Sequence, residues 1–148
     1  MKRDDIVAEA RSWLGTKWQH QASLKGKAAD CIGLVRGVYT DLTGITVQTP
    51  IDYPATWHLY RQEEWLYPEV AKYAEEIPVT DTQPGDVLLF GFGKGPAAHC
   101  GILVTADTFI HAYGEAGRAV ETHLDSQMRK ATWRDHIRAA FRFPGVTD

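Results

Sequence analysis

Cysteine is scarce in this sequence, since only Cys31 and Cys100 occur among its 148 residues. Two cysteines are too few for the disulfide framework of a small secreted domain. The paired Cys-x-x-Cys spacing of structural zinc sites is also missing. The sequence has no internal repeat and no low-complexity segment. Each cysteine therefore needs its own explanation.

Long apolar runs are missing as well. No stretch approaches the roughly 20 apolar residues that span a bilayer, so we expect no membrane insertion. Near the N-terminus, Asp4 and Asp5 follow two basic residues directly, and no unbroken apolar region comes after them. This is not the pattern of a secretory signal peptide. We expect the protein to be made in the cytoplasm and to reach any other place by different means.

Basic residues are not in excess, because 16 Lys and Arg stand against 19 Asp and Glu and give a formal charge of −3. A nucleic-acid partner is therefore not expected, since binding phosphates requires a basic surface. The length and the 44% hydrophobic content predict one globular domain over residues 1–148.

Two amphipathic helices are predicted in the first third of the chain. Each begins at an aspartate that can cap it and ends at a glycine, over residues 4–15 and 30–44. Gly33 and Gly37 lie four residues apart inside the second helix. Because glycine weakens a helix interior, we expect these two to allow close approach to a neighbouring element.

The rest of the chain predicts strands. The region 50–77 looks like an interrupted helix that contains the aromatic segment Trp57–Tyr73, whose role the sequence leaves open. After the turn Pro84–Asp86, short apolar segments predict strands at 87–90, 100–104 and 109–112, with weaker ones near 120–122 and 139–143. Helices followed by closely connected strands predict an α+β fold, with N-terminal helices packed on an antiparallel sheet.

Cys31 is the candidate nucleophile. It follows the capping residue Asp30, and the exposed N–H groups of a helix start stabilise a thiolate there. Of the six histidines, only His99 and His111 fall at or within predicted strands. His99 is the candidate base, and His111 on the next strand is the candidate for orienting its ring.

The other interpretations are a buried core cysteine at Cys31 and a strand histidine bound by backbone at His111. Alternation along a strand puts His99 and Cys100 on opposite faces. If His99 faces Cys31, we expect Cys100 to point away from it into the core. A zinc protein built from both cysteines and the histidines is disfavoured for the same reason.

Three segments resemble the NlpC/P60 family of cell-wall peptidases. Residues 29–35 (Ala-Asp-Cys-Ile-Gly-Leu-Val) look like the family's nucleophile segment. Residues 83–90 with 99–102 are similar to its Pro-Gly-Asp turn, strand and His-Val-Gly-Ile motif. Residues 109–112 match the site of its third polar residue. The three matches occur in the family's order and spacing, from about residue 4 to 120.

The resemblance implies a papain-like α+β fold in which Cys31, His99 and His111 form a catalytic triad. It also implies hydrolysis of a stem-peptide bond in bacterial peptidoglycan, typically between D-glutamate and a diamino acid, without a metal or other cofactor. Trp18 takes the position of the tyrosine in the family's Gly-x-Pro-Tyr and is a candidate oxyanion donor, although packing under the catalytic helix would explain it equally well. Asp30 caps the helix, and its negative charge is expected to lie near the site.

The run Trp18–Ser23 is more similar to small single-domain members encoded with phage tails and gene transfer agents. That resemblance implies action at the cell wall or periplasm, with delivery by a phage-like tail and tail or baseplate proteins as partners. Two alternatives stay open. One is a tail-hub structural or wall-binding module with little activity, and the other is a thioester acyltransferase on the same fold.

Overall fold

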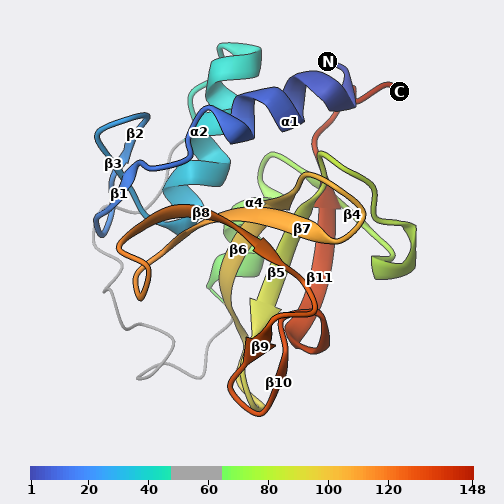
Figure 1. Cartoon of the computed structure of the whole chain (residues 1–148). Coiled ribbons are helices and arrows are strands. Elements are labelled where there is room, and N and C mark those ends of the chain that lie inside the picture. Colours follow the sequence, from blue (N-terminus) through green and yellow to red (C-terminus); the bar gives the residue numbers. More distant parts are fainter. Residues whose placement is uncertain (48–64) are drawn as a thin grey trace.

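The computed structural model describes residues 1–47 and 65–148 and packs helices on one face of a mostly antiparallel sheet (Figure 1). The helices are α1 (Arg3–Arg11), α2 (Cys31–Thr43) and α4 (Leu66–Ala71). This arrangement confirms the predicted α+β class. Residues 57–64 of the aromatic segment Trp57–Tyr73 lie outside the described residues, and its remaining part contains α4.

The sheet has nine strands in the described part of the chain, in the order β2-β3-β1-β8-β7-β6-β5-β11-β4. Strands β5 to β8 form the predicted antiparallel meander, and β11 pairs with the outer side of β5. The bounds are β1 (Lys17–Trp18), β2 (Ser23–Leu24), β3 (Ala28–Ala29), β4 (Glu75–Ile77), β5 (Val87–Gly91), β6 (Ala97–Leu103), β7 (Thr108–Tyr113), β8 (Arg118–His123) and β11 (Ile137–Arg142). A separate hairpin joins β9 (Gln127–Met128) and β10 (Ala131–Thr132).

The predictions for two elements are wrong in detail. The first helix does not begin at an Asp4 cap, and it ends at Arg11 rather than at Gly15. Lys2 is its N-cap, and the Asp5 carboxylate accepts a hydrogen bond from the Lys2 N–H at 3.1 Å. The second error is the assignment of residues 50–77 to interrupted helix throughout, since Glu75–Ile77 pairs with β11 as an edge strand. Such two- or three-residue strands are too short for a periodic pattern to reveal.

The glycines of α2 allow the predicted close contacts. A Cβ at Gly33 would lie 1.9 Å from the backbone oxygen of Ala22, and one at Gly37 would lie 2.3 Å from the Trp13 ring. The first contact holds the loop before α2 against the helix, and the second lets α1 and its following turn pack against it. Gly44 ends α2 in the left-handed conformation, with φ of 75°.

The two faces of the sheet bury different clusters. The helix-side cluster includes residues of all three helices together with Cys100, Ile102 and Ile110 from the sheet. The opposite cluster comprises Leu88, Phe90, Leu103, Phe109, Leu124, Trp133 and Ala140. Because side chains alternate along a strand, β6 and β7 contribute to both clusters.

A buried carboxylate connects the two ends of the chain to the meander. Asp86 is fully buried and pairs with Arg3 from α1 at 3.2 Å and with Arg142 from β11 at 2.8 Å. The backbone N–H of Gln83 also donates to it at 2.8 Å. Lys2 forms a bridge with Thr147, so the two termini lie side by side (Figure 1). The turn Pro84–Asp86 is thus a structural anchor.

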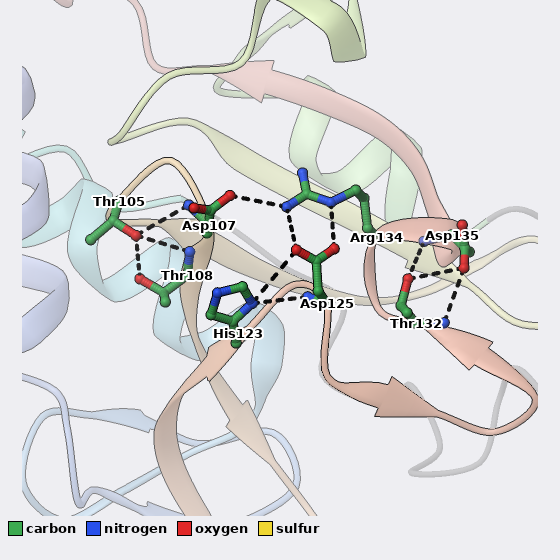
Figure 2. Close-up of polar contacts among 8 residues, drawn as sticks. All are labelled: Thr105, Asp107, Thr108, His123, Asp125, Thr132, Arg134 and Asp135. Carbon is green, nitrogen blue, oxygen red and sulfur yellow. Dashed lines mark hydrogen bonds and ion pairs between the residues drawn. The ribbon is translucent and has the colours of Figure 1, made fainter.

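Arg134 fixes the segment that follows the β9–β10 hairpin. Figure 2 shows its guanidinium between two carboxylates, with Asp125 at 2.8 Å and Asp107 at 3.2 Å. These exposed pairs contribute little stability individually. Arg134 directly follows Trp133, which is only 3% exposed. Trp133 lies on the face of the sheet opposite the helices, where its ring contacts those of His99 and His111.

We predict that Gly33→Ala destabilises the protein by about 1–3 kcal/mol, because the new methyl group collides with backbone that cannot rotate away. Denaturant unfolding measures the change. Gly95→Ala is the matched control, since a Cβ there would only touch the Phe92 oxygen at 3.5 Å. Equal stability of the two variants would show that the loop before α2 moves aside without cost.

Candidate active site

Asp30 positions Cys31 at the start of α2. One carboxylate oxygen accepts a hydrogen bond from the Gly33 N–H at 2.8 Å, which confirms the predicted cap. The other oxygen accepts from the Gln21 N–H, also at 2.8 Å. The same side chain therefore fixes the first turn of the helix and the loop before it. Cys31 is the first helical residue, where the positive end of the helix dipole favours a negative charge.

The pKa of the Cys31 thiol lies well below its ordinary value. Interaction with the Cys100 thiol is the largest cause, and the His99 imidazole acts in the same direction through hydrogen bonding and charge, whereas desolvation opposes both. Cys31 is a free thiol and is half-buried. The arrangement favours the nucleophilic thiolate form.

Cys100 is the core residue that the sequence predicts, but it does not point away from Cys31. It is fully buried, and burial together with the neighbouring Cys31 raises its pKa well above the ordinary value. Alternation still separates Cys100 from His99. However, the pairs between β6 and β7 end at Ile102 and Ile110, before His99 is reached. Cys31, the first residue of α2, interacts with both Cys100 and His99.

The structure brings the two strand histidines together. His99 lies on β6 and His111 on β7, and the Nε2 atom of His99 is 2.7 Å from the Nδ1 atom of His111. Gly101 lets the strands approach this closely, since a Cβ there would lie 2.7 Å from the Ile110 oxygen. His99 thus has one ring nitrogen directed at His111, and the same ring interacts with Cys31.

His111 is a neutral member of this arrangement. Its exposed fraction is 0%, and burial together with the charge of His99 lowers its pKa to about 2. Aromatic rings enclose it, with Tyr113 stacked at 5.1 Å and Trp133 edge-on at 5.0 Å between ring centroids. A neutral imidazole has one N–H donor and one acceptor nitrogen, so its hydrogen bonds have a defined direction.

Thr122 is a residue of the site that the sequence analysis missed. Its hydroxyl oxygen lies 2.8 Å from the Nε2 atom of His111. The sequence gives a weak strand at this position and no further signal, because a threonine on a strand is ordinary. The pairing of β7 with β8 is what brings the two side chains together.

A cavity of about 230 Å³ opens beside Cys31 and His99. Its described lining comes from β1 and the loop before α2, the starts of α2, α4 and β6, the end of β7, and the β9–β10 hairpin. It includes Trp18, His20, Asp30, Cys31, Trp65, Phe92, His99, Tyr113, Glu115 and Arg129. All predicted site residues except the buried His111 therefore line one cavity.

Trp18 lies where it can face a bound substrate, and its role as an oxyanion donor stays a prediction. It lines the cavity, and its ring packs on Gly114, where an added Cβ would lie 3.6 Å from it. His20, Tyr113 and Arg129 also line the cavity, but the sequence analysis assigned them nothing. Only Tyr113 had a possible signal, since it lies two residues after His111 and therefore on the same strand face.

Two further searches concern the described residues alone. Within residues 1–47 and 65–148, no helix is both long and apolar enough to cross a membrane. In that same part of the chain, no three His, Cys, Asp or Glu side chains are grouped so that they could hold a metal ion.

Comparison with known proteins gives one family. The sequence model of the NlpC/P60 family matches residues 13–142. A "Probable endopeptidase" of Haemophilus influenzae (strain ATCC 51907 / DSM 11121 / KW20 / Rd) is 24% identical over 130 residues, which cover 87% of this chain and 70% of that protein. The "Gamma-DL-glutamyl hydrolase" of Bacillus subtilis (strain 168) is 24% identical over 143 residues, which cover 96% of this chain and only 30% of that protein.

The fold is similar to solved structures. The NlpC/p60 domain of the peptidoglycan hydrolase SagA superposes with a TM-score of 0.66 at 21% sequence identity, and the match covers 97% of this chain and 100% of that domain. At this identity the likeness concerns the fold. It agrees with the helices and the mostly antiparallel sheet described above.

We predict that burial of neutral His111 makes the protein acid-sensitive. Its pKa rises from about 2 in the folded state to about 6.5 on unfolding, so between these values the unfolded chain binds the extra proton. Stability therefore falls as the pH drops below about 6.5, by roughly 2 kcal/mol at pH 5 from this residue.

Denaturant unfolding at pH 7.5 and pH 5 measures this loss in wild type and His111→Gln. The variant should lose about 2 kcal/mol less between the two values than wild type. His123→Gln, which changes an exposed histidine, should lose as much as wild type. Identical losses in all three proteins would mean that His111 is already protonated or solvated in the folded state.

Proposed function

Since the chain belongs to the NlpC/P60 family, we propose that it is a cysteine endopeptidase that hydrolyses a stem-peptide amide bond in bacterial peptidoglycan. One observation carries the proposal. A thiol whose pKa is depressed lies beside His99, and His99 is hydrogen-bonded to a buried neutral His111. Hydrolysis by a cysteine nucleophile needs a reactive thiolate, a residue that carries the proton and a group that holds that residue in place.

In the proposed cycle the Cys31 thiolate attacks the amide carbonyl, and a bond forms between sulfur and carbon. The Cys31 backbone N–H and the Trp18 indole N–H are the proposed donors to the oxyanion. His99 then gives its proton to the leaving amine as the carbon–nitrogen bond breaks. Water attacks the thioester while His99 accepts its proton, and the product acid and free thiolate are released.

The γ-glutamyl bond to a diamino acid is the proposed site of cleavage. The family resemblance implies this bond, and one relative is called a gamma-DL-glutamyl hydrolase. The cavity also fits a polar peptide better than a lipid, because Asp30, Glu115 and Arg129 contribute charged groups to its lining. This lining favours a peptidase over a same-fold acyltransferase that carries an acyl chain.

We further propose that residues 1–148 act as one catalytic domain that a phage-like tail or baseplate delivers to the cell wall or periplasm. The support is the similarity of Trp18–Ser23 to the small family members encoded with phage tails and gene transfer agents. The termini lie together on the edge far from the β9–β10 hairpin (Figure 1), so attachment to a partner there would leave the cavity open.

We predict that purified peptidoglycan releases stem-peptide fragments when incubated with wild type, and that mass spectrometry of the fragments identifies the bond. Cys31→Ala and His99→Ala should each reduce the rate by at least about 10³-fold, because neither half of a nucleophile–base pair works alone. His123→Ala, which changes a histidine outside the cavity, should retain the wild-type rate. If wild type releases nothing yet binds the wall or a tail protein, a structural module on this fold is the better description.

A further inference from the structure

The second ring nitrogen of His111 has a specific partner. While Nδ1 faces His99, Nε2 lies 2.8 Å from the hydroxyl oxygen of Thr122 on the neighbouring strand. Phe109 is paired directly with Thr122, and His111 lies two residues further along the same face of β7. Three adjacent strands thus carry a continuous chain of hydrogen bonds from β6 to β8.

The number of N–H donors on the two imidazoles gives this series of hydrogen bonds a direction. When His99 holds the proton that it will give to the leaving amine, both of its ring nitrogens carry hydrogen and both must donate. The Nδ1 atom of His111 must then accept. A neutral His111 consequently carries its hydrogen on Nε2, and that N–H needs an acceptor at the position of the Thr122 hydroxyl.

We propose that Thr122 is a positioning residue, which accepts the Nε2–H of His111 and so fixes the tautomer in which His111 receives the hydrogen bond of His99. The inference rests on the proposed function, because it assigns His99 as the proton carrier. A hydroxyl suits this place better than a carboxylate. It accepts the hydrogen bond without the negative charge that would draw a proton onto His111.

The other side chains around His111 leave the Thr122 hydroxyl as the acceptor for the Nε2–H of His111. Of the groups packed against His111, the titratable ones are His99 and Tyr113, and Trp133 offers only a donor. Tyr113 donates its hydroxyl to Glu115 at 2.7 Å. The titratable groups that act on Cys31 in turn are Cys100, His99 and Tyr73.

The test uses thiol alkylation, which needs no peptidoglycan. The rate at which iodoacetamide modifies Cys31 is followed against pH by mass spectrometry in wild type, Thr122→Val and Thr122→Ser. Thr46→Val is the matched control, since Thr46 is exposed and lies after the end of α2, outside the strands that carry His99, His111 and Thr122. Nitrogen-15 NMR of the imidazoles reports directly which nitrogen of His111 carries hydrogen.

We expect wild type to show an activated thiol and hydrogen on Nε2 of His111. Thr122→Val should slow alkylation near pH 6 about tenfold and shift the profile to higher pH, while Thr122→Ser and Thr46→Val should match wild type. A folded Thr122→Val with the wild-type profile and tautomer overturns the inference but leaves the proposed function. An ordinary, unactivated Cys31 in wild type overturns both.

A separate observation concerns Arg129 in the β9–β10 hairpin. The pairs Met128–Ala131 and Gln127–Thr132 leave a two-residue turn, whose first residue Arg129 has φ of 59°. Two-residue hairpin turns favour glycine, asparagine or aspartate at such a position, and the long side chain of an arginine there is strained. Because such strain is often found at functional sites, this conformation at the edge of a cavity indicates a functional role for the Arg129 side chain.

The guanidinium of Arg129 is held at the cavity. Its central carbon lies 4.9 Å from the centre of the Phe92 ring, and both residues line the cavity with Cys31 and His99. Contact with the ring face orients the cation without neutralising it. Within the described residues, Arg129 takes part in no ion pair with a carboxylate at 4.0 Å or less.

We infer that Arg129 binds a carboxylate of the substrate next to the scissile bond. This also rests on the proposed function, since a γ-linked glutamyl residue leaves its α-carboxylate free. The ligand class is a short acidic peptide, and the planar guanidinium matches the two oxygens of a carboxylate.

Calorimetry on the Cys31→Ala protein tests this without turnover. The probes are the tripeptide L-alanyl-γ-D-glutamyl-L-lysine and its analogue with a glutamyl α-carboxamide. Arg129→Gly, added to that background, should weaken binding of the carboxylate peptide about tenfold and leave binding of the carboxamide unchanged. It should also raise the melting temperature, because glycine relieves the strained turn. Lys130→Ala is the matched cationic control from the same turn and should change neither.

An equal loss for both peptides, or none for either, overturns the role of Arg129 and leaves the proposed function standing. If Cys31→Ala binds neither peptide although wild type digests peptidoglycan, the cut bond lies elsewhere and the inference fails. If Cys31→Ala binds neither peptide and wild type does not digest peptidoglycan, the proposed function fails as well.

Discussion

The carboxylate of Asp30 is the constraint on which the site depends. One oxygen holds the first turn of α2 and the other holds the Gln21 N–H, so helix and preceding loop are fixed together. The absence of a side chain at Gly33 allows this contact, since Ala22 presses its carbonyl against the helix there. Cys31 consequently sits at the positive end of α2, in the place where it meets the sheet.

The sheet supplies the second half of the arrangement. Its strands β6, β7 and β8 present His99, His111 and Thr122 in turn, and the burial of His111 among aromatic rings keeps that ring neutral. Burial is costly for an imidazole unless both nitrogens are satisfied, and here both have partners. The acid sensitivity expected of the fold and the fixed direction of the hydrogen bonds therefore have one cause.

Much of this was predictable from local sequence. The cap at Asp30, the strand positions of His99 and His111, and the α+β order follow from turn residues and apolar periodicity, which act over a few residues. The expectation that Cys100 points away from Cys31 was wrong, because the two thiols interact. Alternation was applied correctly to β6, but the sequence could not reveal that β6 and β7 stop pairing before His99. Helix and strand ends depend on tertiary contacts that local patterns do not contain.

The sequence by itself determined the family, the chemical types of the candidate residues and the elements that carry them. These depend on short motifs whose backbone preferences are local. Only the tertiary structure decided which side chains contact one another. It brought Thr122 to His111 through strand pairing, placed Arg129 over Phe92, and set Cys100 beside Cys31. Each pair is separated by 11 residues or more, and contacts over such separations depend on register and packing, which no local pattern encodes.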